Sequence, residues 1–121
     1  MTKPFIEHVN ITVTNPRKTA NLLELLFDWE TRWTGSGKSG GTTIHVGTTD
    51  HYLAVWSMNE GYKPSYSGLN HIGIVVDDLD LVETKVIELG LKPYNHGDYE
   101  PGRRFYFNDP DGIEFEVVSY S

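Results

Sequence analysis

A pattern of residues that recurs in the two halves of the chain constrains its fold more than any other feature. The segment His8–Val13 (HVNITV) resembles His71–Val76 (HIGIVV) at an offset of 63 residues. Two further pairs of segments match at nearly the same spacing: Leu22–Leu25 with Val86–Leu89 at an offset of 64, and Tyr52–Val55 with Glu114–Val117 at 62. Three separate segments that agree within one residue indicate a duplicated structural unit.

In the first half, the residues predict a strand, a helix and three further strands. Apolar and polar residues alternate from Phe5 to Val13, which is the period of a strand with one buried face. Asn15-Pro16 then begins a helix that ends near Phe27. The residues expected on its buried face are Leu22, Leu23, Leu25 and Leu26. The further strands are expected at Trp29–Thr34, Thr42–Val46 and His51–Met58, with Gly35–Gly41 as a flexible hairpin loop.

The second half repeats this order after a connector at 59–68. A strand is expected over Leu69–Val76, followed by a helix that Asp77-Asp78 caps and Gly90 ends. Three strands are expected to follow, at Lys92–Tyr99, Arg103–Phe107 and Ile113–Val118, with a tight turn at Asp109–Gly112. The sequence therefore predicts an α+β fold, a single domain over residues 1–121. Two βαβββ modules, about 1–60 and 68–121, pair to form a cup-shaped mixed sheet with the helices outside.

Composition excludes several classes of protein. The chain of 121 residues has 10 Lys and Arg against 17 Asp and Glu, a net charge of −7, so we expect no nucleic-acid partner. No apolar run approaches the roughly 20 residues that span a bilayer, and no signal peptide is recognisable, so we expect a cytoplasmic protein without membrane contact. With no cysteine, disulfides and thiolate metal sites are excluded.

The duplication brings three potential metal ligands together. His8 and His71 occupy the same repeat position, on the strand face opposite the aliphatic residues. Glu116 lies opposite Phe115 and Val117. Two imidazoles and one carboxylate form the facial triad that suits Fe(II) or Mn(II), and a three-ligand Zn(II) site is also chemically possible. Glu114 shares the face of Glu116 and is the alternative ligand if the strand register differs by two.

Other polar and aromatic residues are expected near these ligands. Tyr106 shares a face with Arg104; if that face is the cup, its phenol is a candidate for proton transfer and Arg104 lines the substrate pocket. Tyr52 and Trp56 flank Ala54 on one strand face and are candidate walls for a flat ligand, although packing in the core explains them equally well. His45 and His51 fall near the third and fourth strands, where we expect surface residues.

The chain resembles the vicinal oxygen chelate superfamily, which includes glyoxalase I, extradiol dioxygenases, fosfomycin-resistance proteins and bleomycin-resistance proteins. The resemblance covers essentially the whole chain and rests on His8 in EHVNI, His71 in LNHIGIVVDD, and the run Phe105–Val117. It implies that His8, His71 and Glu116 bind a divalent metal. It also implies an enzyme, a dioxygenase, lyase or isomerase, that chelates vicinal oxygens of a small-molecule substrate.

Departures from the family pattern narrow the expected chemistry. Glyoxalase I has a fourth protein ligand on the fourth strand, and the repeat places Ala54 there, which disfavours glyoxalase I itself. The extradiol signature also includes a histidine, for which His96 is the candidate, but its spacer is longer than the signature expects. The alternative function is a metal-free protein of the bleomycin-resistance type that sequesters a ligand.

A homodimer is expected, because paired sheets leave edge strands that a partner can cover.

Overall fold

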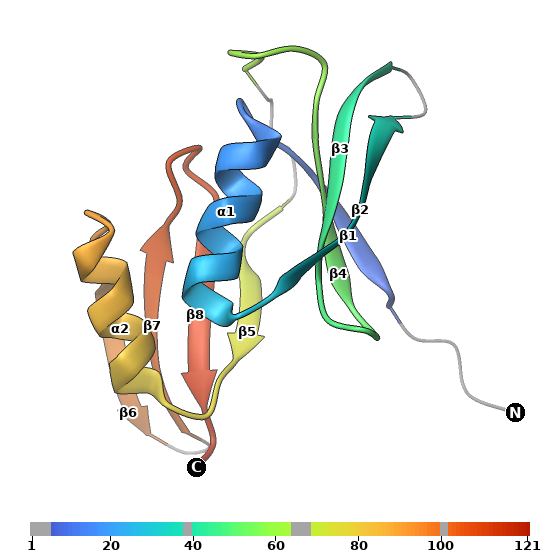
Figure 1. Ribbon diagram of the computed structural model, residues 1–121. Helices are drawn as coiled ribbons and strands as arrows, with labels where there is room; N and C mark the ends of the chain where they lie inside the picture. The colour runs from blue at the N-terminus through green and yellow to red at the C-terminus, as the bar shows by residue number, and fades with distance from the viewer. Residues whose placement is uncertain (1–5, 38–39, 64–68, 100–101) are drawn as a thin grey trace, which may run out of the picture. The chain divides into compact units, whose positions relative to one another are not determined.

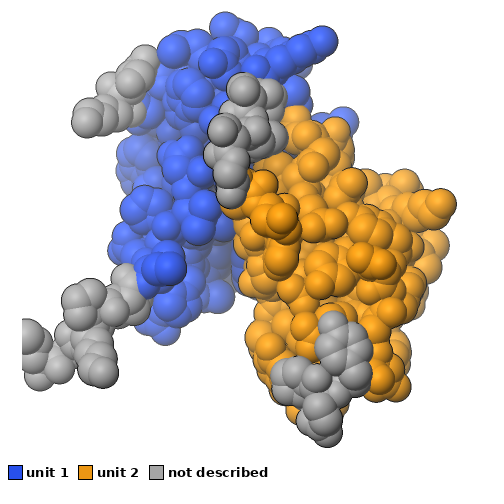
Figure 2. All heavy atoms as spheres, turned by 180° about the vertical axis from the view of Figure 1, so that it is seen from behind, with its two compact units in different colours: residues 1–65 blue, residues 66–121 orange. Residues whose placement is uncertain are grey.

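The chain divides into two compact units, residues 1–65 and 66–121 (Figure 2). The computed structural model describes residues 6–37, 40–63, 69–99 and 102–121. Each unit contains one four-stranded sheet and one helix in the order strand, helix and three strands (Figure 1). The predicted α+β fold of two βαβββ modules is therefore confirmed.

The first unit is built around a mixed sheet in the order β1-β4-β3-β2. The elements are β1 (His8–Thr12), α1 (Pro16–Phe27), β2 (Glu30–Gly37), β3 (Gly40–Gly47) and β4 (Tyr52–Ser57). The first and last strands, β1 and β4, are parallel neighbours, whereas the other pairs are antiparallel. Parallel strands need a long crossover connection, and α1 belongs to that crossover and packs on β2, β3 and β4.

The second unit repeats this topology with the sheet order β5-β8-β7-β6. Its elements are β5 (Ile72–Val75), α2 (Leu79–Glu88), β6 (Tyr94–Tyr99), β7 (Gly102–Asn108) and β8 (Glu114–Ser119). The outer pair β5 and β8 is again parallel, and α2 packs on β7 and β8. Residues 64–68 of the expected connector lie outside the described residues.

Both helices begin at the residues that the sequence predicts. The side chain of Asn15 accepts a hydrogen bond from the backbone N–H of Lys18 at 3.1 Å, and Asp78 accepts one from Leu81 at 3.0 Å. The expected buried face of α1 is partly wrong: Leu23 is buried, but Leu25 is 60% exposed. The buried residues of α1 are Pro16, Thr19, Ala20, Leu23 and Leu26, whose spacing keeps them on one stripe of the helix. Neither helix in the described part of the chain is long and apolar enough to cross a membrane.

The strands β2 and β3 extend further into the glycine-rich segment than its composition suggests. Instead of a loop over Gly35–Gly41, β2 continues to Gly37 and β3 begins at Gly40, and residues 38–39 lie outside the described residues. A Cβ atom added to Gly37 would lie 2.5 Å from Nε1 of Trp56, so glycine is needed there to make room for the indole ring. The predicted loop over Gly35–Gly41 is therefore too long, because Gly37 belongs to β2 and packs closely against Trp56.

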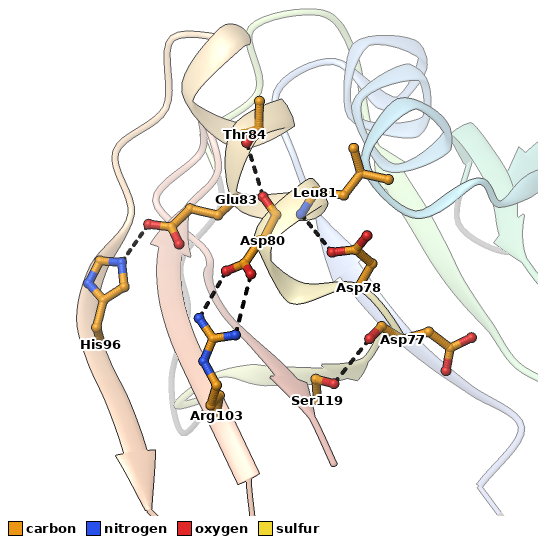
Figure 3. A network of polar contacts seen from close by, with 9 residues as sticks. All are labelled: Asp77, Asp78, Asp80, Leu81, Glu83, Thr84, His96, Arg103 and Ser119. Carbon is orange, nitrogen blue, oxygen red and sulfur yellow. Dashed lines mark hydrogen bonds and ion pairs between the residues drawn. The ribbon is translucent and has the colours of Figure 1, made fainter. Parts of the chain in front are cut away.

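Charged residues link α2 to strands β6 and β7 of its sheet (Figure 3). Asp80 forms an ion pair with Arg103 on β7 at 2.9 Å, and Glu83 pairs with His96 on β6 at 2.6 Å (Figure 3). The His96 ring also stacks on Phe105, which is fully buried. The candidate extradiol histidine is therefore held between β6 and the helix by structural contacts.

The predicted turn at Asp109–Gly112 is present and contains a buried carboxyl group. Asp109 is 5% exposed, and its Oδ1 accepts hydrogen bonds from the backbone N–H groups of Asp111 and Ile113, both at 2.9 Å. Its Oδ2 is buried and has no hydrogen-bond partner among the described residues. Burial, reinforced by the nearby charge of Asp111, raises the pKa of Asp109 from 3.8 to about 6.

This carboxyl group makes stability depend on pH. Folding raises the pKa of Asp109, so the protonated carboxyl group contributes to the free energy of unfolding. This contribution is complete below about pH 3.8 and is lost as the pH rises through about 6. We expect the stability of the wild type relative to Asp109→Asn to fall between pH 4.5 and 7.5, by at most about 3 kcal/mol. Urea unfolding of both proteins across this range measures the difference, and parallel pH profiles would contradict the prediction.

Candidate functional site

The face of the second sheet opposite α2 carries a group of polar side chains. In β8 the residues alternate, with Phe115 and Val117 fully buried and Glu114 and Glu116 on the other face. Glu116 is paired in register with Gly73 of β5 and with Tyr106 of β7. The side chains on or beside this face include His71, Tyr94, Arg104, Tyr106, Glu114 and Glu116.

His71 and Glu116 meet on this face. His71 immediately precedes β5, and its Nε2 lies 3.2 Å from Oε1 of Glu116. The other carboxylate oxygen of Glu116, Oε2, accepts a hydrogen bond from Arg104 at 2.8 Å. The side chains of Arg104 and Glu116 are both largely buried. On the opposite side of the imidazole ring, Nδ1 lies 2.7 Å from Oδ1 of Asn70. Arg104 and Asn70 thus orient the two candidate ligands.

The carboxylate of Glu114 has different partners from that of Glu116. Its Oε1 lies 3.8 Å from Nδ1 of His71, beyond hydrogen-bond distance. Its Oε2 accepts a hydrogen bond of 2.5 Å from the phenol of Tyr94, a residue that the sequence analysis did not single out. Burial and this hydrogen bond raise the pKa of Tyr94 to about 12. In this register Glu116 faces the His71 Nε2 atom, and Glu114 holds Tyr94.

Tyr106 lies beside the two candidate ligands. Its ring packs edge-on against His71, with ring centroids 5.9 Å apart, and roughly parallel to Tyr94 at 6.2 Å. Its position in register with Glu116 places it on the same face of the sheet. The phenol is therefore near the His71–Glu116 pair, as a residue that handles a substrate proton must be.

In the first unit, a row of four rings crosses the sheet in strand order. It runs from His8 on β1 through Tyr52 on β4 and His45 on β3 to Trp33 on β2. Successive ring centroids are 4.9, 4.4 and 4.8 Å apart. The expectation that His45 is simply a surface residue was incomplete. His45 lies beside Trp33 because the register of β2 shifts between Thr31 and Trp33. No local sequence pattern reveals this register shift.

Charged groups surround this row. Glu7 Oε1 lies 3.0 Å from Nδ1 of His8 and accepts a hydrogen bond of 3.2 Å from the Tyr52 phenol. These two hydrogen bonds, that of His8 first, lower the pKa of Glu7. The guanidinium of Arg32 lies over the Tyr52 ring, 4.4 Å from its centroid. Burial, followed by the charges of His8 and Arg32, lowers the pKa of His45, which favours its neutral form.

The remaining candidate residues have structural contacts in the same unit. Trp56 donates a hydrogen bond from Nε1 to the backbone oxygen of Gly40 at 2.8 Å and packs edge-on against Tyr62. Ala54, at the fourth-ligand position, is 3% exposed and pairs in register with His45. His51 Nδ1 lies 3.1 Å from the backbone oxygen of Ile6, which links the turn before β4 to the segment before β1.

The donor atoms of His71 and Glu116 fit a shared metal ion. When two ligand atoms each lie about 2.1 Å from one ion and the ligand–ion–ligand angle is between 90° and tetrahedral, the two atoms are roughly 3.0–3.4 Å apart. Nε2 of His71 and Oε1 of Glu116 are 3.2 Å apart. Within the described parts of the chain, no three His, Asp or Glu residues gather closely enough to hold a metal. His8 lies in the first unit, whereas His71 and Glu116 lie in the second.

Solved structures of similar fold come from several bacteria. A glyoxylase/bleomycin resistance protein/dioxygenase domain from Frankia sp. EAN1pec has a TM-score of 0.82 at 19% identity, with 98% of each chain covered. The fosfomycin resistance protein FosX from Mesorhizobium loti has a TM-score of 0.75 at 25% identity, with 97% of this chain and 92% of that chain covered.

A second FosX structure contains a metal ion. FosX from Listeria monocytogenes, complexed with Mn(II) and sulfate, has a TM-score of 0.77 at 18% identity, with 99% of this chain and 95% of that chain covered. No curated protein sequence matches the chain significantly.

The family match spans both modules. Residues 5–117 match the model of the family described as the Glyoxalase/Bleomycin resistance protein/Dioxygenase superfamily. This range includes β1, β4, β5 and most of β8, together with His8, His71 and Glu116. The chain belongs to the glyoxalase/bleomycin resistance protein/dioxygenase superfamily.

Proposed function

We propose that the chain is a metal-dependent enzyme that acts on a small molecule with two adjacent oxygen atoms. His8, His71 and Glu116 are the protein ligands of the metal in this proposal. A bound divalent ion supplies Lewis-acid stabilisation of negative charge that develops on the substrate. Dioxygenase, lyase and isomerase reactions all belong to this class, and Ala54 at the fourth-ligand position disfavours glyoxalase I.

The observation that carries this proposal is the approach of His71 Nε2 to Glu116 Oε1 at 3.2 Å. Arg104 holds the second oxygen of that carboxylate, which leaves Oε1 directed at the imidazole. The Mn(II) in FosX from Listeria monocytogenes supports the choice of a divalent ion and makes Mn(II) the first metal to test. Fe(II) and Zn(II) suit the same donors.

The other side chains have proposed roles around this site. Tyr106, beside His71, donates a proton to a substrate oxygen or removes one from it. Arg104, through its contact with Glu116, lies at the edge of the substrate pocket. Tyr52 and Trp56 form its aromatic wall and favour a flat substrate.

Metal content tests the proposal directly. Purified protein should contain close to one divalent metal per site by inductively coupled plasma mass spectrometry, and His8→Ala and His71→Ala should each lose most of it, because each removes one of three ligands. His96→Ala and His51→Ala are matched controls, since these histidines contact Glu83 and the Ile6 backbone, and both should retain metal.

Full metal retention by both ligand variants would refute the assignment. A wild type that contains no metal, and binds none after incubation with Mn(II), Fe(II) or Zn(II), favours the alternative function. In that case the chain sequesters a ligand as bleomycin-resistance proteins do. The row of rings from His8 to Trp33 is the feature that supports such binding, and a tight complex with a flat aromatic compound would establish it.

Thermal stability distinguishes the two glutamates. Metal at 100 times its Kd should stabilise the fold by about 2.7 kcal/mol, which raises Tm by on the order of 10 °C. We expect Glu116→Gln to lose most of this shift and Glu114→Gln to keep it, each measured against the same variant without metal. The reverse result would make Glu114 the ligand. The wild-type shift should fade below about pH 5.5, because protons compete with metal for the ligands.

We also propose a homodimer. Within each sheet two strands, β1 and β2 or β5 and β6, pair on one side only, and such edges favour association. Light scattering after size-exclusion chromatography at micromolar concentration should give about twice the chain mass of 13.7 kDa. A single species of the chain mass would refute the dimer without bearing on the metal site.

A further inference from the structure

The residue that precedes each candidate metal-binding histidine contacts the same atom of its ring. Glu7 Oε1 lies 3.0 Å from Nδ1 of His8, and Asn70 Oδ1 lies 2.7 Å from Nδ1 of His71. Glu7 and Asn70 are separated by 63 residues, the same offset that relates the two histidines. The contact therefore recurs at equivalent positions of the two modules.

The chemistry of this contact in the first module sets the position of a proton. An ionised carboxylate has no hydrogen to donate, so the bond to Glu7 requires the hydrogen on Nδ1 of His8. A neutral imidazole with its hydrogen on Nδ1 has its lone pair on Nε2, and only that nitrogen can then bind a metal. A carboxylate on the far nitrogen also makes the imidazole a stronger ligand.

Further contacts keep Glu7 in place. Its backbone oxygen accepts a hydrogen bond from the N–H of Tyr52 at 3.0 Å, which fixes the segment beside β4. Its side chain also accepts a hydrogen bond from the Tyr52 phenol, and the Tyr52 ring stacks on His8 with an angle of 13° between the planes. Glu7, His8 and Tyr52 therefore form a closed set of contacts that restrains the imidazole ring.

We propose that Glu7 is a positioning residue that holds His8 with the hydrogen on Nδ1 and so presents Nε2 as the metal ligand. This inference rests on the proposed function, in which His8 binds the metal. The side chains of His8 and Glu7 are 45% and 55% exposed, so their contact contributes little to stability, and removing it should leave the fold intact.

Nitrogen NMR of the metal-free full chain tests this assignment without any enzyme assay. Long-range ¹H–¹⁵N spectra at about pH 8.5, where an ordinary imidazole is neutral, identify which ring nitrogen carries the hydrogen. The wild type should show a protonated Nδ1 at His8. Glu7→Ala should shift the hydrogen to Nε2, whereas Glu7→Gln should keep it on Nδ1, because the amide oxygen still accepts a hydrogen bond.

Mn(II) titration of the same proteins provides the second measurement. Glu7→Ala should weaken Mn(II) binding by roughly 10–100-fold, as expected for loss of a residue that orients a ligand, and Glu7→Gln should recover most of the affinity. Glu60→Ala removes the same charge from an exposed position of the same unit and should match the wild type. An effect of equal size in Glu60→Ala would show that charge alone is responsible and would overturn the proposal.

The outcomes for Glu7 and for the metal site are separable. A wild-type His8 with its hydrogen on Nε2, or a Glu7→Ala variant with an unchanged tautomer, overturns the role of Glu7 even if the protein binds metal. A wild type with the expected tautomer that binds no Mn(II), Fe(II) or Zn(II) overturns the proposed function, while the assignment of Glu7 to the His8 tautomer stands.

Discussion

The parallel pairing of the first and last strands of each module determines where every candidate ligand lies. Because β1 pairs with β4 and β5 with β8, residues at opposite ends of a module become neighbours on one sheet. In the second module this pairing places Gly73 level with Glu116 and brings His71 to the same carboxylate. Without the parallel pair, the histidine and the glutamate would belong to separate parts of the sheet.

The hydrophobic core fixes the register of these strands. Phe115 and Val117 are fully buried, and a slip of one residue would move them out of the core and bury Glu116 instead. Placing an unpaired carboxylate there costs several kcal/mol, so the aliphatic and aromatic residues of β8 indirectly determine which glutamate faces His71. The site is therefore specified by residues that take no part in its chemistry.

Much of this arrangement is visible in the sequence. The repeat predicts both modules, and Asn15 and Asp78 predict the helix starts, because these features depend on local chemistry. The ring row of the first module is not visible, since the position of Trp33 beside His45 follows from a register shift within β2. The role of His96 is hidden for a related reason, because its partner Glu83 comes from the helix that packs on the same sheet.

The glycine-rich hairpin shows how composition can mislead. Glycine is common in flexible loops because it lacks a side chain, but the same property allows rings to pack directly on the backbone. Gly37 and Gly41 both lie against Trp56, where an added Cβ atom would fall within 3.0 Å of Nε1. Only the position of the indole ring, which the sequence does not give, distinguishes the two uses of glycine.

The two modules differ in the side chains that they carry at equivalent strand positions. At the repeat offsets of 63 for the first strand and 62 for the last, His8 corresponds to His71, Tyr52 to Glu114 and Ala54 to Glu116. The second module thus has an imidazole with two carboxylates, whereas the first has an imidazole within a row of rings. Carboxylate donors suit a divalent ion, and an aromatic face suits the apolar part of a ligand. After the repeat arose, this exchange of side chains gave equivalent strands of the two modules different chemistry, carboxylates in one and aromatic rings in the other.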